Sequence, residues 1–304
     1  MSGPIRALAL SLLAWCLLTS TARAEDGVLV LGRVSDDPKA HYEQLKPLLD
    51  YVVPRMKDVG IREGRILMAK GDRQMASYLR SGRVDWVTET PASAVLLRQR
   101  AEAVPLLSTA RGGSQEYTTV FFVRRDSQLR AIEDLRGGAI AFQNPASTSA
   151  YVVPAYELLS RGLRLEVQIS PVDRPFGSSV GYVFARSERN IVTWVAKGLV
   201  DAGAVSDQDW RDPARVPDSY RRQLRVLHVS KPFPRALELV SASTRPEIRA
   251  RLKEVLLQAP NDPAGAKALA AFFGTAGFKP IDAGMLRKLD YIEAAVNRVR
   301  EEVE

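Results

Sequence analysis

Short apolar runs rich in β-branched residues alternate with amphipathic segments of helical periodicity from residue 27 onward. In the first third of the chain, strands are predicted at residues 27–34, 65–69 and 84–87, and helices at residues 42–56, 72–80 and 91–101. A chain that alternates strand and helix in this way can bury its apolar faces in a mostly parallel sheet with helices on both sides. The pattern therefore predicts an α/β fold.

The same pattern continues to the end of the chain. YTTVFFV at residues 117–123 is the strongest strand signal, because it combines β-branched and aromatic residues. Further strands are predicted at residues 138–142, 165–169, 200–205, 224–229 and 237–241, and helices at residues 150–161, 188–197, 246–258, 264–273 and 285–303. Residues 182–184 are ambiguous. No linker rich in Pro, Gly or Ser divides the chain, so two lobes would be joined by crossing strands, with residues 117–123 and 224–241 as candidates.

The first 24 residues have the pattern of a secretory signal peptide. Arg6 precedes an apolar run at residues 7–18, and a small-x-small cleavage site ends at Ala24. The run is shorter than the about 20 apolar residues that a membrane-spanning helix needs. We expect cleavage after Ala24 and a periplasmic location. The alternatives are a buried N-terminal helix and lipidation of Cys16, which the bulky Trp15 disfavours.

Cleavage would leave 280 of the 304 residues and no cysteine, because Cys16 is the single cysteine of the chain. A chain of that length can build one large or two ordinary hydrophobic cores without disulfides. His41 and His228 are the only histidines, and no cluster of residues has the spacing of a metal site. We therefore expect neither a metal nor a cofactor.

The formal net charge of +8 falls to +6 if the leader takes Arg6 and Arg23 with it. A basic balance hints at anionic ligands or an anionic membrane surface. However, arginines alternate with acids along most segments, as at residues 245–254, which is typical of solvated helix faces. Beyond residue 24 no apolar stretch is long enough to span a membrane. We expect no nucleic-acid partner, no stable membrane insertion, and a monomer.

Three hydroxyl residues, Ser147, Thr148 and Ser149, lie where a predicted strand gives way to a helix. The first N–H groups of a helix lack internal partners, and the helix dipole adds positive potential there, so this position favours anions. Three hydroxyls add donors that suit a phosphate, phosphonate or sulfonate group. Pro154 fits the first helical turn, where its missing N–H is not needed. The alternative is ordinary N-capping.

The segment FQNPASTSAYVVPAYELL resembles the S-T-S-G-Y-x-x-P segment of the phosphate/phosphite/phosphonate-binding proteins of ABC importers. Four other segments resemble the same family in the same order: GRVDWVTETPASAVLL, EYTTVFFVRRDS, LRGGAIAF and GYVFARSERNIVTWVAKGLVDAGAVSD. The resemblance covers nearly the whole chain after the first 24 residues. It implies a solute-binding protein that captures a small oxyanion for an ABC permease, and not an enzyme.

The resemblance also implies a two-lobed type II periplasmic-binding-protein fold, in which each lobe is a mixed, mostly parallel sheet flanked by helices. We expect residues 25–116 plus 234–304 to form one lobe and residues 117–233 the other. Ser147, Thr148 and Ser149 match the oxyanion-binding triplet of the family. Ala150 replaces the usual glycine, and its methyl group could narrow the approach to the ligand.

Five other polar residues are expected at the same cleft, because ligands of open α/β sheets bind beyond the carboxyl ends of strands. Glu89 and Thr90 end the third strand, and Ser206 and Asp207 follow the strand VDAGAV. Tyr117 could stack on the ligand or form a hydrogen bond with it. An acid at Asp207 resembles those that hold the ammonium group of an aminoalkylphosphonate. The alternative is ordinary polarity at loop ends or between the lobes.

Two other functions remain as alternatives. Residues 177–181 fit the G-x-S-x-G motif, and Asp207 and His228 follow in the order of an α/β-hydrolase triad. Pro171 and Pro175 interrupt the strand that such a motif needs before its serine, which argues against a hydrolase. A periplasmic protein that reports its ligand to a signalling system needs the same closing cleft as an importer. That alternative stays open.

Overall fold

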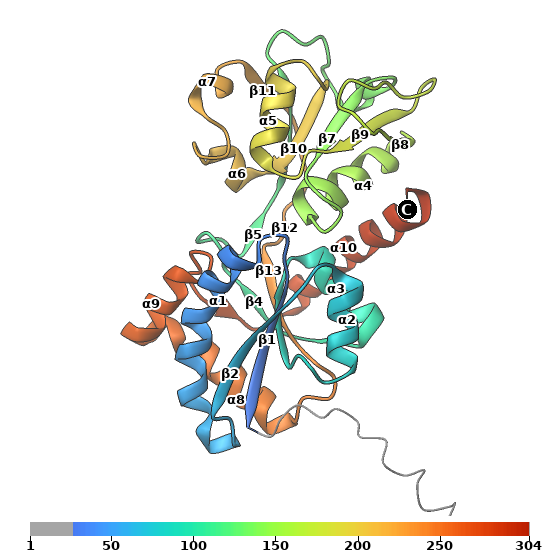
Figure 1. Ribbon diagram of the computed structural model, residues 1–304. Helices are drawn as coiled ribbons and strands as arrows, with labels where there is room; N and C mark the ends of the chain where they lie inside the picture. The colour runs from blue at the N-terminus through green and yellow to red at the C-terminus, as the bar shows by residue number, and fades with distance from the viewer. Residues whose placement is uncertain (1–26, 304) are drawn as a thin grey trace, which may run out of the picture.

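The structure is a computed structural model that describes residues 27–303. Two six-stranded sheets carry helices on their faces and form two lobes, placed one above the other in Figure 1. The predicted signal peptide, residues 1–24, lies outside the described residues. Within residues 27–303, no helix combines the length and the apolar character needed to cross a membrane.

The sheet of the first lobe has the strand order β14-β4-β13-β3-β1-β2. Its strands are β1 (Val28–Val34), β2 (Glu63–Ala69), β3 (Trp86–Glu89), β4 (Val104–Thr109), β13 (Ala236–Val240) and β14 (Phe278–Lys279). β1 pairs in parallel with β2 and β3, whereas β13 is antiparallel to both β3 and β4. Thus β1 to β4 share one direction, and β13 runs against them because it enters from the other lobe and not through a crossover helix.

The sheet of the second lobe has the order β11-β6-β10-β7-β9-β8. Its strands are β6 (Thr119–Arg124), β7 (Ala139–Phe142), β8 (Leu165–Val167), β9 (Val180–Phe184), β10 (Ala202–Ser206) and β11 (Leu224–Val229). β7 to β10 pair in parallel, and β6 is antiparallel to its two neighbours. The predicted fold class, with two mixed and mostly parallel sheets, is confirmed.

A small two-stranded sheet connects the lobes. β5 (Glu116–Tyr117) and β12 (Phe233–Pro234) pair antiparallel, with Tyr117 opposite Phe233. They lie between the two large sheets in Figure 1. The predicted strand at residues 117–123 is therefore divided: Tyr117 belongs to this connection, and the residues from Thr119 onward belong to the second lobe.

Within residues 27–303, six α-helices follow strands of the first lobe or its C-terminal segment, and four belong to the second lobe. The first set is α1 (Pro38–Val52), α2 (Asp72–Arg80), α3 (Pro91–Ala101), α8 (Pro246–Gln258), α9 (Pro263–Ala271) and α10 (Ala283–Glu302). The second set is α4 (Val153–Ser160), α5 (Glu188–Ala196), α6 (Asp207–Arg211) and α7 (Asp218–Arg221). Three 3-10 segments, Val53–Val59, Ile132–Leu135 and Ala259–Asn261, and a π-helical turn, Thr148–Val152, complete the described elements.

Several boundaries differ from the predicted ones for local reasons. α1 begins at Pro38 and not at residue 42, because Asp37 caps it by accepting a hydrogen bond from the Ala40 amide at 3.1 Å. β3 begins at Trp86 and not at residue 84, because the Asp85 side chain accepts the hydrogen bond of a strand amide in β1. β4 was not predicted from the sequence, because its second residue is a proline, and its pairing with β13 contains a register shift.

The C-terminal helix α10 ties the lobes together. It leaves the first lobe and ends beside α4 of the second (Figure 1). Ile292 and Val296 of α10 pack in one hydrophobic cluster with Leu159 and Leu163 of the second lobe. The lobes therefore share part of a core, in addition to their two crossing segments.

Candidate functional site

Two helix starts from different lobes meet between the sheets. α3 begins directly after β3 of the first lobe, and the π-helical turn that leads into α4 follows β7 of the second. The Thr148 Oγ1 atom accepts a hydrogen bond from the backbone amide of Ala92 at 3.0 Å. This contact places the unpaired N–H groups and positive dipole ends of both helices in the same region, which suits an anion.

The three hydroxyl residues of the predicted triplet have different roles in this structure. The Ser147 Oγ atom accepts a hydrogen bond from the Ala150 amide at 3.2 Å, which is the ordinary cap considered above. Thr148 and Ser149 are buried, with 1% and 8% of their surface exposed. The Ser149 carbonyl accepts a hydrogen bond from the Thr119 hydroxyl at 2.8 Å, which holds the turn against β6. Thr148 and Ser149 therefore remain the candidates for ligand contact.

The turn that carries the triplet is π-helical because of Pro154. Proline lacks an N–H and its ring crowds the carbonyl four residues earlier, which belongs to Ala150. The Ala150 carbonyl accepts a hydrogen bond from the Gln143 amide at 3.0 Å, and the Val153 amide bonds back to the Thr148 carbonyl. Pro154 lies in the first turn of α4, as predicted, but the wider π turn precedes it. π turns are frequent at functional sites.

Tyr117 connects the triplet to the crossing strands. The side chains of Ser149 and Thr148 lie close enough to the Tyr117 hydroxyl to lower its pKa, against the larger effect of burial. Its ring lies 4.6 Å from that of Phe233, and the Arg235 guanidinium lies over it at 4.7 Å. Burial raises the pKa of Tyr117, so the phenol stays protonated and able to donate at neutral pH.

Glu89 and Thr90 lie at the end of β3, as predicted, beside the start of α3. The Glu89 Oε1 atom accepts a hydrogen bond from the Val34 amide at 2.6 Å, and burial raises the pKa of this carboxyl. The hydroxyls of Thr90 and Ser93 are buried and have no hydrogen-bond partner within the described residues. Two unpaired hydroxyls at a helix start are donors that a bound anion would satisfy.

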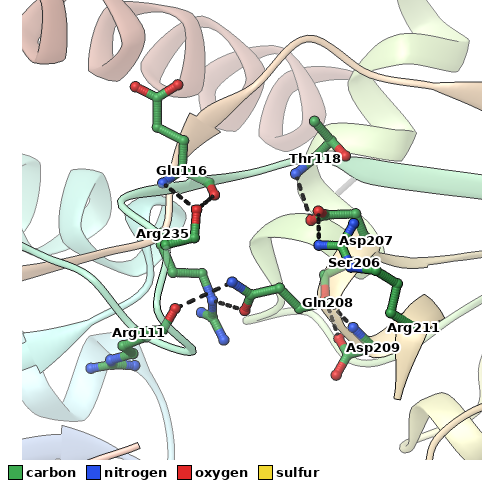
Figure 2. A network of polar contacts seen from close by, with 10 residues as sticks. Arg111, Glu116, Thr118, Ser206, Asp207, Gln208, Asp209, Arg211 and Arg235 are labelled. Atoms are coloured by element: carbon green, nitrogen blue, oxygen red, sulfur yellow. Dashed lines mark hydrogen bonds and ion pairs between the residues drawn. The ribbon is translucent and has the colours of Figure 1, made fainter. Parts of the chain in front are cut away.

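Ser206 and Asp207 form contacts within the second lobe and its connection to the first (Figure 2). Ser206 caps α6, accepting a hydrogen bond from the Asp209 amide at 3.0 Å and donating its own to the Asp209 carboxylate. The Asp207 carboxylate accepts a hydrogen bond from the Thr118 amide at 3.0 Å and pairs with Arg211 at 2.5 Å. Both Asp207 oxygens thus have protein partners, and these contacts give no support to an ammonium-binding role.

Gln208 bridges the lobes next to this cap (Figure 2). Its Nε2 atom donates a hydrogen bond to the Arg111 carbonyl at 3.2 Å, and its Oε1 atom accepts one from Arg235 Nε at 2.7 Å. Neither Gln208 nor its partners were singled out from the sequence. The bridge brings the loop after β4 against the start of α6.

A group of buried charges in the first lobe was not predicted from the sequence. Arg33 lies near the end of β1, Arg111 follows β4, and Glu238 lies in β13; all three are buried. The Glu238 carboxylate accepts three hydrogen bonds at 2.7 Å, from Trp86, Thr88 and Thr109. The rule that pointed to Glu89, namely a position at a strand end, would also have pointed to Arg33.

His41 lies against this group. Its Nδ1 atom is 2.6 Å from the Ser35 hydroxyl, and its ring lies 5.7 Å from that of Phe273. Burial, followed by the charge of Arg33, lowers the pKa of His41 to about 4, so the imidazole is neutral at physiological pH. No group of three or more potential metal ligands occurs among residues 27–303.

The sequence model of the family described as "ABC transporter, phosphonate, periplasmic substrate-binding protein" matches residues 32–286. The chain belongs to this phosphonate-binding family. The resemblance stated from the sequence motifs is thereby confirmed, and membership implies an extracytoplasmic location. Members of the family are solute-binding proteins that work with ABC permeases.

Solved structures agree with this assignment. XAC2383 from Xanthomonas citri bound to chloride ion is 51% identical, with a TM-score of 0.89 over 91% of this chain and 100% of that one. The same protein bound to ATP is 50% identical, with a TM-score of 0.88 over 92% of this chain and 100% of that one. PhnD1 from Prochlorococcus marinus in complex with methylphosphonate shares the fold, at 18% identity and a TM-score of 0.66 over 91% of this chain and 100% of that one.

The G-x-S-x-G match does not have the geometry of a hydrolase nucleophile. Ser179 follows a turn and directly precedes β9, whereas the motif requires a strand before the serine and a helix after it. Asp207 pairs with Arg211, and His228 lies 3.6 Å from the Glu157 carboxylate. These contacts do not assemble a triad.

Proposed function

We propose that this member of the phosphonate-binding family captures a small oxyanion of the phosphate, phosphite or phosphonate type and delivers it to the permease of an ABC importer. It acts as a binding protein and not as an enzyme, and it works as a monomer without metal or cofactor. The ligand contacts would come from Thr148, Ser149 and Tyr117 on one side and from Glu89 and Thr90 on the other. Ser147 would position the helix start of the second lobe, and Ser206 and Asp207 would hold the start of α6 beside the connection between the lobes.

The observation that carries this proposal is the meeting of two helix starts around buried hydroxyls. Thr148 reaches the amide of Ala92 across the lobes, while the hydroxyls of Thr90 and Ser93 have no partner among the described residues. A tetrahedral oxyanion has enough acceptor positions to satisfy such donors at once. A neutral ligand would leave the two helix dipoles uncompensated.

The similar structures support an anionic ligand without fixing its identity. The relative from Xanthomonas citri, at 51% identity, carries chloride in one structure and, at 50% identity, ATP in another. Both are anions, and they differ greatly in size. We therefore place the anionic group at the triplet and leave the rest of the ligand to be tested.

Binding should close the lobes around the ligand. The moving bodies would be residues 25–116 plus 234–304 and residues 117–233, with the hinge at β5 and β12. Each lobe offers only part of the donor set, so the ligand stabilises the closed arrangement that completes it. Small-angle scattering should show a smaller radius of gyration at saturating ligand, and an unchanged radius would count against the hinge.

The direct test is a thermal-shift screen followed by calorimetry. Phosphate, phosphite, methylphosphonate, methanesulfonate, chloride and ATP are compared at matched ionic strength. A ligand present at 100 times its Kd should stabilise the protein by about 2.7 kcal/mol. If none of these anions raises the melting temperature or gives a binding isotherm, the proposed function is wrong.

The importer role needs a separate test. Proteoliposomes that contain the partner permease and its ATPase should take up the anion only when this protein is present. Uptake that does not depend on this protein would favour the signalling alternative.

A further inference from the structure

Two buried arginines of the first lobe have too few partners for their charge. Arg33 is 8% exposed and Arg111 is 2% exposed. Both donate to Thr88: Arg33 to the carbonyl at 2.9 Å, and Arg111 to the hydroxyl. The Nε atom of each is buried without a hydrogen-bond partner, and neither guanidinium has an ion pair within 4.0 Å in residues 27–303. Buried guanidinium groups are ordinarily paired, because an isolated charge is costly to bury.

One aromatic ring lies against both arginines. The guanidinium carbon of Arg33 is 4.6 Å from the centre of the Phe273 ring, and that of Arg111 is 4.4 Å from the same centre. Phe273 has a φ of 53°, in the left-handed region that bulky residues rarely adopt. Strained backbone of this kind is concentrated at ligand-binding and active sites. The ring attracts each cation but carries no charge that would offset their mutual repulsion.

The nearby carboxylates do not neutralise the pair by direct contact. The oxygens of Glu238 bind side chains of the sheet, and Glu89 binds the amide of Val34. Burial is the main cause that lowers the pKa of Arg111, and the charge of Arg33 is the next. Arg235 lowers it further, whereas Glu238 and Glu89 raise it, and Asp36 also raises the pKa of Arg33, so the two guanidinium groups have carboxylates nearby but, among the described residues, none in direct contact.

A chain of contacts through Arg235 and Gln208 leads from the oxyanion triplet to Arg111. Arg235 lies over the ring of Tyr117, whose hydroxyl is near the side chains of Thr148 and Ser149, and its Nε atom donates a hydrogen bond to Gln208 at 2.7 Å. The carbonyl of Arg111 bonds to Gln208 of the second lobe, so Arg111 lies at the boundary between the lobes. A ligand held by the triplet could therefore extend toward the guanidinium groups.

We infer that Arg33 and Arg111, with the ring of Phe273, form a second anionic subsite, and that the ligand carries two anionic groups. This inference rests on the proposed function, because the triplet holds the first group, a phosphonate or phosphate. The second group is a carboxylate or another phosphate, since the planar fork of donors on arginine matches both. Phosphonocarboxylates and organic bisphosphates are the ligand classes that fit.

Calorimetry with three small phosphonates tests the inference. Methylphosphonate offers one anionic group, phosphonoacetate adds a carboxylate, and aminomethylphosphonate adds an ammonium group instead. We expect phosphonoacetate to bind at least about tenfold more tightly than methylphosphonate, and aminomethylphosphonate to bind more weakly than both. Arg111→Gln and Arg33→Gln should each remove most of the advantage of phosphonoacetate and leave the Kd for methylphosphonate within about threefold. Arg73→Gln, at an exposed arginine of α2, is the matched control and should change none of the three affinities.

The outcomes distinguish a failure of the proposed function from a failure of the second subsite alone. If wild type binds none of the three phosphonates, the proposed function fails and the second subsite falls with it. If methylphosphonate binds but phosphonoacetate gains nothing, or if aminomethylphosphonate binds best, only the second subsite is refuted. Retained methylphosphonate binding shows that a variant is folded. If Arg111→Gln does not bind methylphosphonate, the affinities for phosphonoacetate and methylphosphonate are compared in Arg33→Gln and Arg111→Lys instead. A loss that is equal for all three ligands would also overturn the inference.

Discussion

The hydroxyl of Thr148, at the start of the π-helical turn in the second lobe, accepts a hydrogen bond from the backbone amide of Ala92, at the start of α3 in the first lobe, at 3.0 Å. An amide of the first helical turn has no partner within its own helix. Thr148 supplies that partner here from the other lobe. Because the threonine is 1% exposed, the contact lies inside the interface between the lobes.

Replacing Thr148 tests its role as a ligand donor. Thr148→Ala should weaken oxyanion binding at least about tenfold, because a hydrogen bond to a charged group contributes about 1.5–3 kcal/mol and 1.4 kcal/mol corresponds to one decade. Thr148→Ser keeps the hydroxyl and should bind nearly as well as wild type. Thr193→Ala removes a hydroxyl that bonds within α5 and serves as the control. Equal affinities for Thr148→Ala and Thr148→Ser would reduce Thr148 to a structural contact.

The C-terminal helix α10, which packs against both lobes, should contribute to the stability of both. Ile292 is fully buried in the cluster shared with the second lobe, so Ile292→Ala should lower the free energy of unfolding by about 2–5 kcal/mol. Leu286→Ala in the same helix, at a residue that is 48% exposed, should change it by less than about 0.5 kcal/mol. Urea unfolding followed by circular dichroism measures both variants. A similar loss for the two variants would contradict the shared core.

Glu238 should be among the most sensitive positions in the first sheet. Glu238→Ala leaves three buried donors without their acceptor, and because each unsatisfied buried donor costs about 1–3 kcal/mol, the expected loss of stability is at least about 3 kcal/mol. Glu247→Ala removes an exposed carboxylate at the start of α8 and should cost less than about 1 kcal/mol. Thermal unfolding at constant pH compares the two. A loss of stability below about 1 kcal/mol for Glu238→Ala would contradict this prediction, because it would mean that water satisfies the three donors in place of the carboxylate.

The buried imidazole of His41 should make stability depend on pH in the acidic range. Its pKa is lowered from 6.5 to about 4 in the folded protein, so the unfolded chain binds more protons between these values. The contribution of His41 to stability is therefore fully present above pH 6.5 and is lost as the pH falls toward about 4. The difference in melting temperature between wild type and His41→Gln should shrink over that interval. A difference that is constant from pH 7 to pH 4 would show that His41 does not titrate in this way.

Local patterns were sufficient to predict the fold class and the position of the triplet. Strand and helix periodicity depends on neighbouring residues, and β1, α2, α3 and β7 appear close to where the pattern put them. Ser147 to Ser149 were recognisable because a strand end, a run of hydroxyls and a following helix are all local features. The different hydrogen bonds of the three hydroxyl residues could not be predicted from the sequence, because the partner of Thr148 lies on the other lobe.

The buried arginines show what the tertiary structure alone decided. Arg33 and Arg111 look like the other arginines of a basic chain, and their burial follows from packing against Phe273, which lies far along the sequence. Asp207 is a different case: its position after a strand suggested a ligand contact, and only the tertiary structure shows that its carboxylate bonds to Thr118 and Arg211. The sequence determines which segments become strands, helices and caps, because those depend on short-range geometry. Which charged side chains lose their water depends on surfaces that segments distant in the sequence bring together only when the lobe has folded.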